Sequence, residues 1–297
     1  MHRTLTLMIA TVLVLAPMAG RAATFTATVG PSSTGGIGNC VIPGLVSGSS
    51  PVSTSGICAD IRGLSSGRAS SSFGHIGARS EGVALGNSSI VAQFGATSVF
   101  TDQLMFTSAD PTATVADVSV NLVLDGILNA AADAAQGGFA GSSVGAIVSL
   151  GSGSFLLQYA INSSGLFTVV HQDLGLTGGV AAPKFNGAFV SPIVRVALGS
   201  PTTFVLYLET GAAGTGSHAS ALSDFSGSFK LPSGSDAFNL PGGVTVNAGD
   251  WLVNNRFIDP LGAPAGVPVP AGWALMIAGV GLAGAALRRR APLAVTA

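Results

Sequence analysis

The chain offers few side chains that could perform chemistry, and none of them stands in a catalytic spacing. The string G-x-S-x-G, which carries the nucleophile of α/β-hydrolases, occurs twice and is centred on Ser65 and Ser143. A nucleophile of that kind needs a sharp turn between a strand and a following helix. Neither string has such surroundings, so the sequence predicts turns at both places and no catalytic serine.

Acidic residues give no stronger signal. A glycosidase needs two carboxylates that face each other across a cleft, and nothing in the sequence brings together Glu81 and Glu209, the only glutamates. Calcium loops need closely spaced oxygen ligands. The central aspartates are instead spread singly and are expected at the surface: Asp102, Asp110, Asp117, Asp125 and Asp133. We therefore predict no catalytic residue, no metal ligand and no cofactor.

Histidines and cysteines are the remaining candidates. His75, His171 and His218 fall in no metal-ligand pattern such as H-E-x-x-H. Cys40 and Cys58 form an isolated pair, which in an oxidising compartment favours a disulfide. Closing that loop would stabilise the fold by roughly 3 kcal/mol in the chain-entropy model. Free thiols and a metal site are the alternatives, but zinc needs closely paired ligands with further Cys or His, and no histidine lies beside this pair.

The composition argues against binding to nucleic acid. Hydrophobic residues make up 47% of the 297 residues and charged residues only 8%, far below the roughly 25% of ordinary soluble chains. All 13 acidic residues, but only seven of the 12 basic ones, lie between Ala23 and Gly266, so this body is mildly acidic. Nucleic acids and anionic lipids need clustered Lys and Arg, whereas the polar residues of the body are mainly Ser, Thr, Asn and Gly.

Short alternating runs predict β-strands through the middle of the chain. Val118, Val120, Leu122 and Leu124 alternate with mostly more polar residues, as a half-buried strand requires. Similar runs occupy residues 25–29, 89–94, 98–106, 146–150, 155–161, 166–171, 193–198, 204–209, 225–231 and 244–247. Gly, Pro, Ser and Asn separate these runs, which predicts one all-β domain over residues 23–262. Its expected form is a β-sandwich, for which a jelly roll is one topology.

Two stretches of the body lack clear alternation. Residues 31–72 are richer in Ser and Gly than the rest and are expected to form long loops at one edge of the sandwich. Residues 126–135 are expected to form a short helix or a loop.

The first 22 residues are organised as a secretory signal peptide. Arg3 precedes a short apolar run that ends at Ala16, and Gly20 and Ala22 supply small residues at positions −3 and −1 of a cleavage site. We predict a signal helix that is removed, so that the mature chain begins near Ala23. An uncleaved membrane anchor is the alternative, but the run is short for a span of about 20 residues, and Pro17 follows it.

Residues 263–297 combine a proline motif, an apolar run and a basic cluster, in that order. The motif begins at Val267, the uncharged run covers residues 271–287, and the cluster is Arg288, Arg289 and Arg290. This run is at the lower limit for a transmembrane helix. The positive-inside tendency keeps the arginines cytoplasmic and the body outside the inner membrane. The alternative is a buried core helix, which would have to solvate three consecutive arginines.

This tail resembles the PEP-CTERM class of bacterial sorting signals. It is most similar to the VPxPA (VPLPA-CTERM) variant, whose pattern is matched by Val267, Pro268, Pro270 and Ala271, while Val269 stands where the main class has Glu. The resemblance implies that an exosortase-type membrane protease with a cysteine nucleophile cuts near the proline motif and releases or transfers the exported body. Residues 225–232, 238–247 and 251–257 are also similar to the distal part of many bodies that carry such a tail.

Together these features predict a non-enzymatic protein of the cell envelope or extracellular matrix. It would begin as an inner-membrane-anchored precursor and end at the cell surface or outside the cell. Its expected partners are the exosortase-type protease, the inner membrane through the tail, and exopolysaccharide. The alternative is a secreted carbohydrate-active enzyme or a calcium-dependent lectin, because a sandwich scaffold does not fix a function. A cleft with converging carboxylates and exposed aromatic side chains would mark that alternative.

Overall fold

The computed structural model describes residues 23–31, 40–85, 91–176, 179–181, 184–216 and 218–258. The predicted signal helix (1–22) and the predicted sorting tail (263–297), with its proline motif, transmembrane helix and arginines, lie outside these residues. The chain divides into two compact units, Met1–Phe257 and Ile258–Ala297, and all but one of the described residues belong to the first. Within the described ranges, no helix is both long enough and apolar enough to cross a bilayer.

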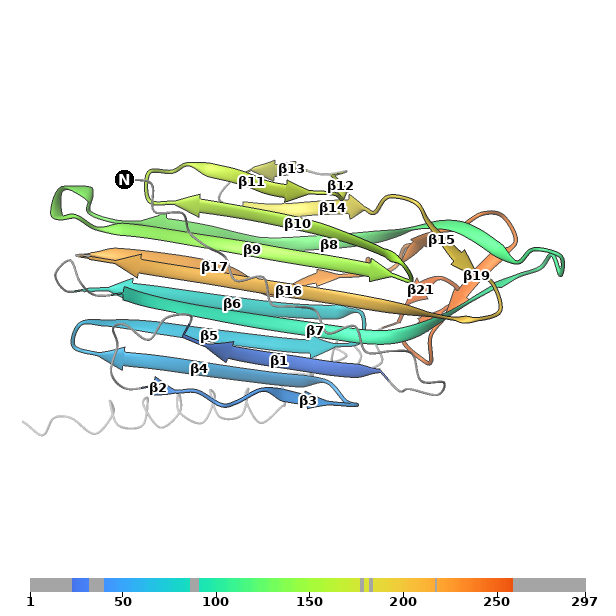
Figure 1. Cartoon of the computed structure of the whole chain (residues 1–297), viewed down its shortest axis with the longest axis horizontal. Helices are drawn as coiled ribbons and strands as arrows, with labels where there is room; N and C mark the ends of the chain where they lie inside the picture. The colour runs from blue at the N-terminus through green and yellow to red at the C-terminus, as the bar shows by residue number, and fades with distance from the viewer. Residues whose placement is uncertain are drawn as a thin grey trace, which may run out of the picture. The chain divides into compact units, whose positions relative to one another are not determined.

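Two antiparallel sheets make up the first unit (Figure 1). Sheet A runs in the order β11 (Phe167–Gln172), β10 (Gly153–Asn162), β9 (Phe139–Leu150), β16 (Pro201–Thr215), β7 (Val91–Ser108), β1 (Thr24–Gly30) and β3 (Val46–Gly48), and β19 (Val244–Asn247) pairs with β7. Sheet B runs in the order β12 (Gly175–Leu176), β14 (Lys184–Val190), β8 (Val115–Ala131), β17 (Ala219–Lys230), β6 (His75–Ala84), β5 (Gly63–Ser72), β4 (Val52–Asp60) and β2 (Cys40–Val41). Three short strands extend it: β13 (Gly179–Ala181) on β14, and β15 (Val194–Ala197) and β18 (Phe238–Asn239) on β8. A small hairpin joins β20 (Leu252–Val253) to β21 (Arg256–Phe257), and a 3-10 helix covers Ala134–Gln136. The predicted all-β sandwich is therefore confirmed.

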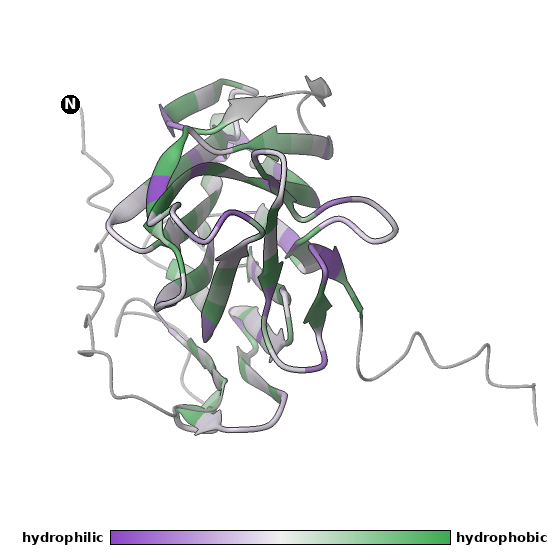
Figure 2. Ribbon diagram, turned by 90° about the vertical axis from the view of Figure 1, so that its right-hand side faces the viewer, coloured by the Kyte–Doolittle hydropathy of each residue, from purple (hydrophilic) through white to green (hydrophobic). Residues whose placement is uncertain are grey.

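Aromatic side chains fill a large part of the space between the sheets. Alternate residues of a strand point to the same face, so Phe100 of β7 and Phe204 of β16 both enter the core and are fully buried. The ring of Trp251 packs edge-on against Phe100 at 5.2 Å between ring centres. Full burial of one such side chain stabilises the fold by about 1.5–3 kcal/mol. Figure 2, which looks along the strands, shows apolar segments in both layers.

Alanine and glycine replace the aromatic side chains where β6 ends and β7 begins. A second cluster of buried residues there consists of alanines alone: Ala84, Ala92, Ala140, Ala212, Ala219 and Ala221. A Cβ atom added to Gly82 in β6 would collide with the carbonyl oxygen of Ala92 in β7, and it would lie 3.3 Å from that of Ala212 in β16. The backbones of the two sheets therefore almost touch at this end, and only glycine fits at position 82.

Buried hydroxyl groups join the two sheets directly. Ser80 of β6 donates to the carbonyl oxygen of Thr210 in β16 at 3.0 Å, and the two hydroxyls lie 2.8 Å apart. Ser223 of β17 donates to the carbonyl oxygen of Ser143 in β9 at 2.8 Å. Two similar bonds join β5 and β7, donated by Ser71 and Ser98. Because buried polar groups need partners, these bonds allow serine to replace apolar residues between closely spaced sheets.

Two expectations about local structure were wrong. Within residues 31–72, the described part forms β2 to β5 instead of long loops, with only short connections between them. Residues 126–131 continue β8, and only Ala134–Gln136 are helical, as a 3-10 turn that Asp133 caps through its side chain. In β4 and β5 the inner positions hold mostly small residues, because the sheets lie close together, so the hydrophobic alternation that reveals a strand is absent. In residues 126–131, Leu128 is the one buried side chain, which is too little alternation to reveal a strand.

Candidate binding surfaces

The segment after β17 lies at one end of the sandwich (Figure 1). β18 pairs with β8 of sheet B, and β19 pairs with β7 of sheet A, so the segment spans both sheets. The hairpin of β20 and β21 follows and turns at Asn254 and Asn255, whose φ angles are 50° and 67°. Positive φ at both central residues is the pattern of a type I′ turn, which fits the twist of a hairpin, and asparagine tolerates it better than most residues.

Two side chains fix this segment in place. The side-chain amide of Asn255 donates to the carbonyl oxygen of Phe238 at 2.7 Å and accepts from the Phe238 N–H at 2.8 Å. It therefore makes the two hydrogen bonds that a neighbouring strand would make with Phe238. The indole N–H of Trp251 donates to the carboxylate of Asp102 in β7 at 2.7 Å. Burial raises the pKa of Asp102 above its ordinary value, although the bonds from Trp251 and from the Gln103 N–H act in the opposite direction.

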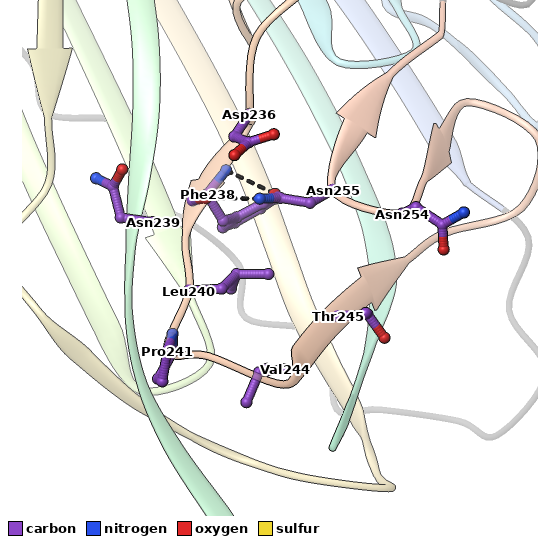
Figure 3. Close-up of a pocket in the computed structure, with 9 residues that line it drawn as sticks. All are labelled: Asp236, Phe238, Asn239, Leu240, Pro241, Val244, Thr245, Asn254 and Asn255. Carbon is purple, nitrogen blue, oxygen red and sulfur yellow. Dashed lines mark hydrogen bonds between the residues drawn. The ribbon is translucent and has the colours of Figure 1, made fainter. Parts of the chain in front are cut away.

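A cavity of about 390 Å³ opens between these elements. Its lining is mixed, with apolar Phe238, Leu240, Pro241 and Val244 beside polar Asp236, Asn239, Thr245, Asn254 and Asn255 (Figure 3). Its volume lies near the lower end of the range for pockets that hold small molecules, about 300–1,000 Å³.

Only part of the polar lining is available to a ligand. The amide of Asn239 is bound to Ser119 and Asn121, and the hydroxyl of Thr245 lies 2.9 Å from that of Thr107. Among the described residues, the side chains of Asp236 and Asn254 have no hydrogen-bond partner. A carboxylate accepts hydrogen bonds and an amide both donates and accepts them, so Asp236 and Asn254 are the polar groups of the lining that stay open to a ligand. The ring of Phe238 is fully buried and offers it no stacking face.

The outer face of sheet A is a second, larger surface. Its side chains come from alternate positions of β1, β7, β16, β9 and β10, and most of them are Thr, Ser, Gln, Gly, Val or Ala. Rows of hydroxyl groups cross the strands, as in the row of Thr24, Thr101, Val205, Ser149 and Ser154. Among the described residues of these five strands, Glu209 is the one charged side chain on this face.

Glu209 lies in a small polar cluster near the middle of the face. The hydroxyl of Tyr207 donates to its carboxylate at 2.7 Å, and Thr97 faces it from the neighbouring strand. Burial and the charge of Glu209 raise the pKa of Tyr207 far above its ordinary value, while a hydrogen bond from Thr97 opposes this rise. Tyr207 is therefore a permanent hydrogen-bond donor, and Glu209 keeps its remaining acceptor positions for an outside group.

The structure separates the residues that could have formed a catalytic pair. Glu81 lies on the outer face of sheet B, where Arg79 bonds to it at 3.2 Å, while Glu209 lies on the outer face of sheet A. These glutamates do not face each other across a cleft. Both G-x-S-x-G strings lie inside strands, Ser65 in β5 and Ser143 in β9, so the expectation of turns was wrong. Neither serine stands at a strand-to-helix turn.

The other predicted positions are scattered. His171 lies in β11 and its ring bonds at 2.8 Å to Asp173, which follows that strand. His75 begins β6, and His218 occupies a turn with φ 55°. Within the part of the chain that the structure describes, no three His, Cys, Asp or Glu residues converge as metal ligands. Asp110 and Asp117 are exposed as expected. Asp102 was wrongly placed at the surface, because it lies half-buried beneath Trp251.

The predicted disulfide is confirmed. Cys40 of β2 and Cys58 of β4 face each other in the ladder, and their sulfur atoms are bonded. Cys58 is buried, whereas Cys40 lies on an exposed edge strand. The bond fastens a strand of only two residues to the rest of sheet B.

Comparisons with known proteins assign no family to the chain. No family model matches it, and neither a curated protein nor a solved structure does. The two surfaces therefore have to be interpreted from their own chemistry.

Sequence reasoning missed both surfaces. The pocket is assembled from residues 236–245 and 254–255, whose sequence shows only turn residues and short strands. The outer face had a visible signal, since Thr97, Thr101 and Gln103 alternate with core residues along β7. That alternation predicted a strand, but it did not show that four neighbouring strands repeat the same uncharged pattern.

Proposed function

We propose that the chain is a non-enzymatic protein of the cell envelope or extracellular matrix that contacts exopolysaccharide through the outer face of sheet A. The observation that carries the proposal is the composition of this face. It presents hydroxyls and amides with Glu209 as its one charged side chain among the described residues of five strands. Hydroxyls and amides both donate and accept hydrogen bonds, as the hydroxyl groups of sugars do. The acidic body favours neutral over anionic polymers.

Export and sorting form the second part of the proposal. Residues 1–22 act as a cleaved signal peptide, and residues 271–287 hold the precursor in the inner membrane, with Arg288, Arg289 and Arg290 in the cytoplasm. An exosortase-type protease then cuts near the proline motif at 267–271. The Cys40–Cys58 disulfide supports this location, because such bonds persist in oxidising compartments. The proposal includes a jelly-roll topology, which the alternation of β6, β7, β8 and β9 between the two sheets supports.

Retention on polysaccharide tests the binding part. The full chain, purified in a mild detergent, is passed over immobilised exopolysaccharide from the producing cells, with a column of the same matrix without polysaccharide as the control. Selective retention is expected. Equal elution from both columns would contradict the binding part of the proposal.

Mapping of both termini tests the sorting part. Mass spectrometry of the chain recovered from membrane, wall and medium is expected to find a start near Ala23 and, outside the membrane, an end close to Pro270. An intact Arg290 on all recovered chains would make the tail a plain anchor.

The pocket favours a second candidate, a lectin that binds one sugar unit. Among the described residues, the side chains of Asp236 and Asn254 have no hydrogen-bond partner, and they lie beside an apolar wall. D236N should therefore abolish binding of a monosaccharide, while D117N, at an exposed site on β8, should not. Loss of binding on calcium removal would identify the calcium-dependent form. Equal binding by both variants would exclude the pocket.

A further inference from the structure

β11 forms an open edge of sheet A. It stands last in the order of that sheet, beside β10, and it is the longest of the described strands that pairs with a neighbour on one side only (Figure 1). A strand at a sheet edge presents a row of N–H and C=O groups that no neighbouring strand pairs. All its residues from Thr168 to Gln172 are exposed. The strand therefore offers backbone donors and acceptors to another extended strand.

This edge lacks most of the features that prevent pairing with another chain. Native edge strands are commonly very short or carry lysine or proline. β11 contains neither residue, and Val169 and Val170 at its centre are 51% and 52% exposed. A bulge at Val170 twists the strand and is its one protective feature, but it adds no charge. Because threonine and valine favour strands, the uncharged run from Thr168 to Val170 suits strand pairing.

The charges beside this edge allow two copies of it to meet. The ring of His171 lies 2.8 Å from the carboxylate of Asp173, so the two titratable groups at the end of β11 partner each other. In an antiparallel pair of β11 strands with Val169 opposite Val170, these two groups would face residues 166–168 of the second copy, which carry no charge. Like charges directly opposite each other destabilise a strand pair, and this arrangement avoids them although the body of the chain is acidic.

We propose that β11 pairs antiparallel with β11 of a second copy of this chain and joins two copies of sheet A into one continuous sheet. A foreign peptide that adds a strand to an edge gains specificity from pockets for its side chains, and β11 contributes no residue to the cavity described above. A second copy brings the same exposed, uncharged strand, and a two-fold axis makes the two edges equivalent. The inference goes beyond glycan binding and does not depend on it.

The length of the seam sets the strength of the association. Six residues at about 3.4 Å each make a seam about 20 Å long. This is short for a permanent dimer, whose interface buries roughly 1,200–2,000 Å² or more. The two copies should therefore associate weakly and in proportion to their concentration, which favours pairing where many copies are held together at one surface.

Lysine at the centre of the seam tests the proposal. In Val169→Lys the two-fold axis would bring two ammonium groups close together, and like charges oppose strand pairing. Self-association of the full chain in a mild detergent, measured by sedimentation velocity over a concentration series, should weaken by about tenfold or more. Val115→Lys is the matched control, because Val115 in β8 is 52% exposed, and it should associate like the wild type. Both variants should keep the circular dichroism spectrum of the wild type, since edge strands tolerate lysine.

Hydrogen exchange locates the seam without any substitution. The amides of β11 should exchange more slowly as the concentration of the wild type rises, whereas those of β3, at the opposite edge of sheet A, should not change. The inference is overturned if the wild type stays monomeric at every concentration, or if Val169→Lys associates as strongly as the wild type. Slow exchange of β11 in a chain that stays monomeric would show another occupant at this edge and would also overturn it. Retention on glycans is measured separately, so none of these outcomes affects the proposed function.

Discussion

A methyl group added at Gly82 is expected to destabilise the sandwich strongly, because it would be inserted between two backbones. The carbonyl oxygen of Ala92 lies well inside the contact distance of the new carbon, and the oxygen of Ala212 is 3.3 Å from it. Both oxygens belong to the opposite sheet and are held in its ladder, so neither can rotate away. The sheets must therefore separate locally in Gly82→Ala, which also stretches the bond from Ser80 to the Thr210 carbonyl, now 3.0 Å.

The magnitude follows from three contributions. Overpacking of a filled interior costs about 1–3 kcal/mol, and a weakened buried hydrogen bond costs about 1 kcal/mol. Replacing glycine by alanine returns about 0.4–1 kcal/mol through the unfolded chain. The free energy of unfolding of Gly82→Ala should therefore fall by about 1–3.6 kcal/mol.

Gly95→Ala is the matched control for this prediction. It makes the same chemical change in the neighbouring sheet, but on the outer face, where the nearest atom to the new carbon is 3.7 Å away. Its free energy of unfolding should rise by about 0.4–1 kcal/mol. Urea denaturation followed by circular dichroism measures both variants, with unchanged m-values as the sign of two-state unfolding. If Gly82→Ala were as stable as the wild type, or if both variants shifted in the same direction, the close approach of the sheets would be refuted.

Three further substitutions test other contacts. The double variant Cys40→Ser/Cys58→Ser should lose about 3 kcal/mol of unfolding free energy, and reducing agent should then have no additional effect; an unchanged midpoint would contradict the role of the bond. Because burial raises the pKa of Asp102 above 3.8, the folded state is favoured while this acid is protonated and loses that advantage as the pH rises through its folded pKa. Asp102→Asn should therefore lack this decline in unfolding free energy. If the difference in unfolding free energy between the variant and the wild type stayed constant from pH 3 to pH 7, the raised pKa of Asp102 would be contradicted. Ser223→Ala removes the bond to the Ser143 carbonyl, 2.8 Å long, and should cost about 1 kcal/mol; the exposed Ser220→Ala on the same strand should cost less than about 0.5 kcal/mol.

The sequence predicted the strands whose inner positions are hydrophobic. The alternation of Val118, Val120, Leu122 and Leu124 lies within β8, and these residues face the core as expected. The same reasoning failed in β5, where the inner positions include Ser65, Gly67 and Ala69. Inner and outer positions alternate in β5, but the inner residues are small. A hydropathy pattern therefore cannot distinguish this strand from a loop. The information that makes this segment a strand lies in the opposite sheet, which comes too close for larger side chains.

The candidate surfaces were less predictable than the fold, because each joins residues that are distant in the chain. The polar groups of the pocket include Asp236 and Asn254, which line one cavity only after β18 has paired with β8 and Arg256 of the β20–β21 hairpin has bridged to Asp236. The outer face of sheet A depends on the register of its strand pairs, and a shift of one residue in any of them would turn outer side chains inward. The sequence gives no sign of the surroundings of Glu209, which Tyr207 and Thr97 set.

The strand glycines that the structure describes with ordinary extended backbone therefore include two physical classes that can be altered independently. Inner glycines such as Gly82 set the distance between the sheets, so any side chain there changes stability before it changes the surface. Outer glycines such as Gly95 lie in ordinary extended backbone with space above them, so a side chain there changes the surface and leaves the core intact. Glycine on the outer face lowers strand stability without improving the packing of the described residues. Under the proposed function, contact between a neutral polymer and the hydroxyl- and amide-rich outer face of sheet A offsets this cost.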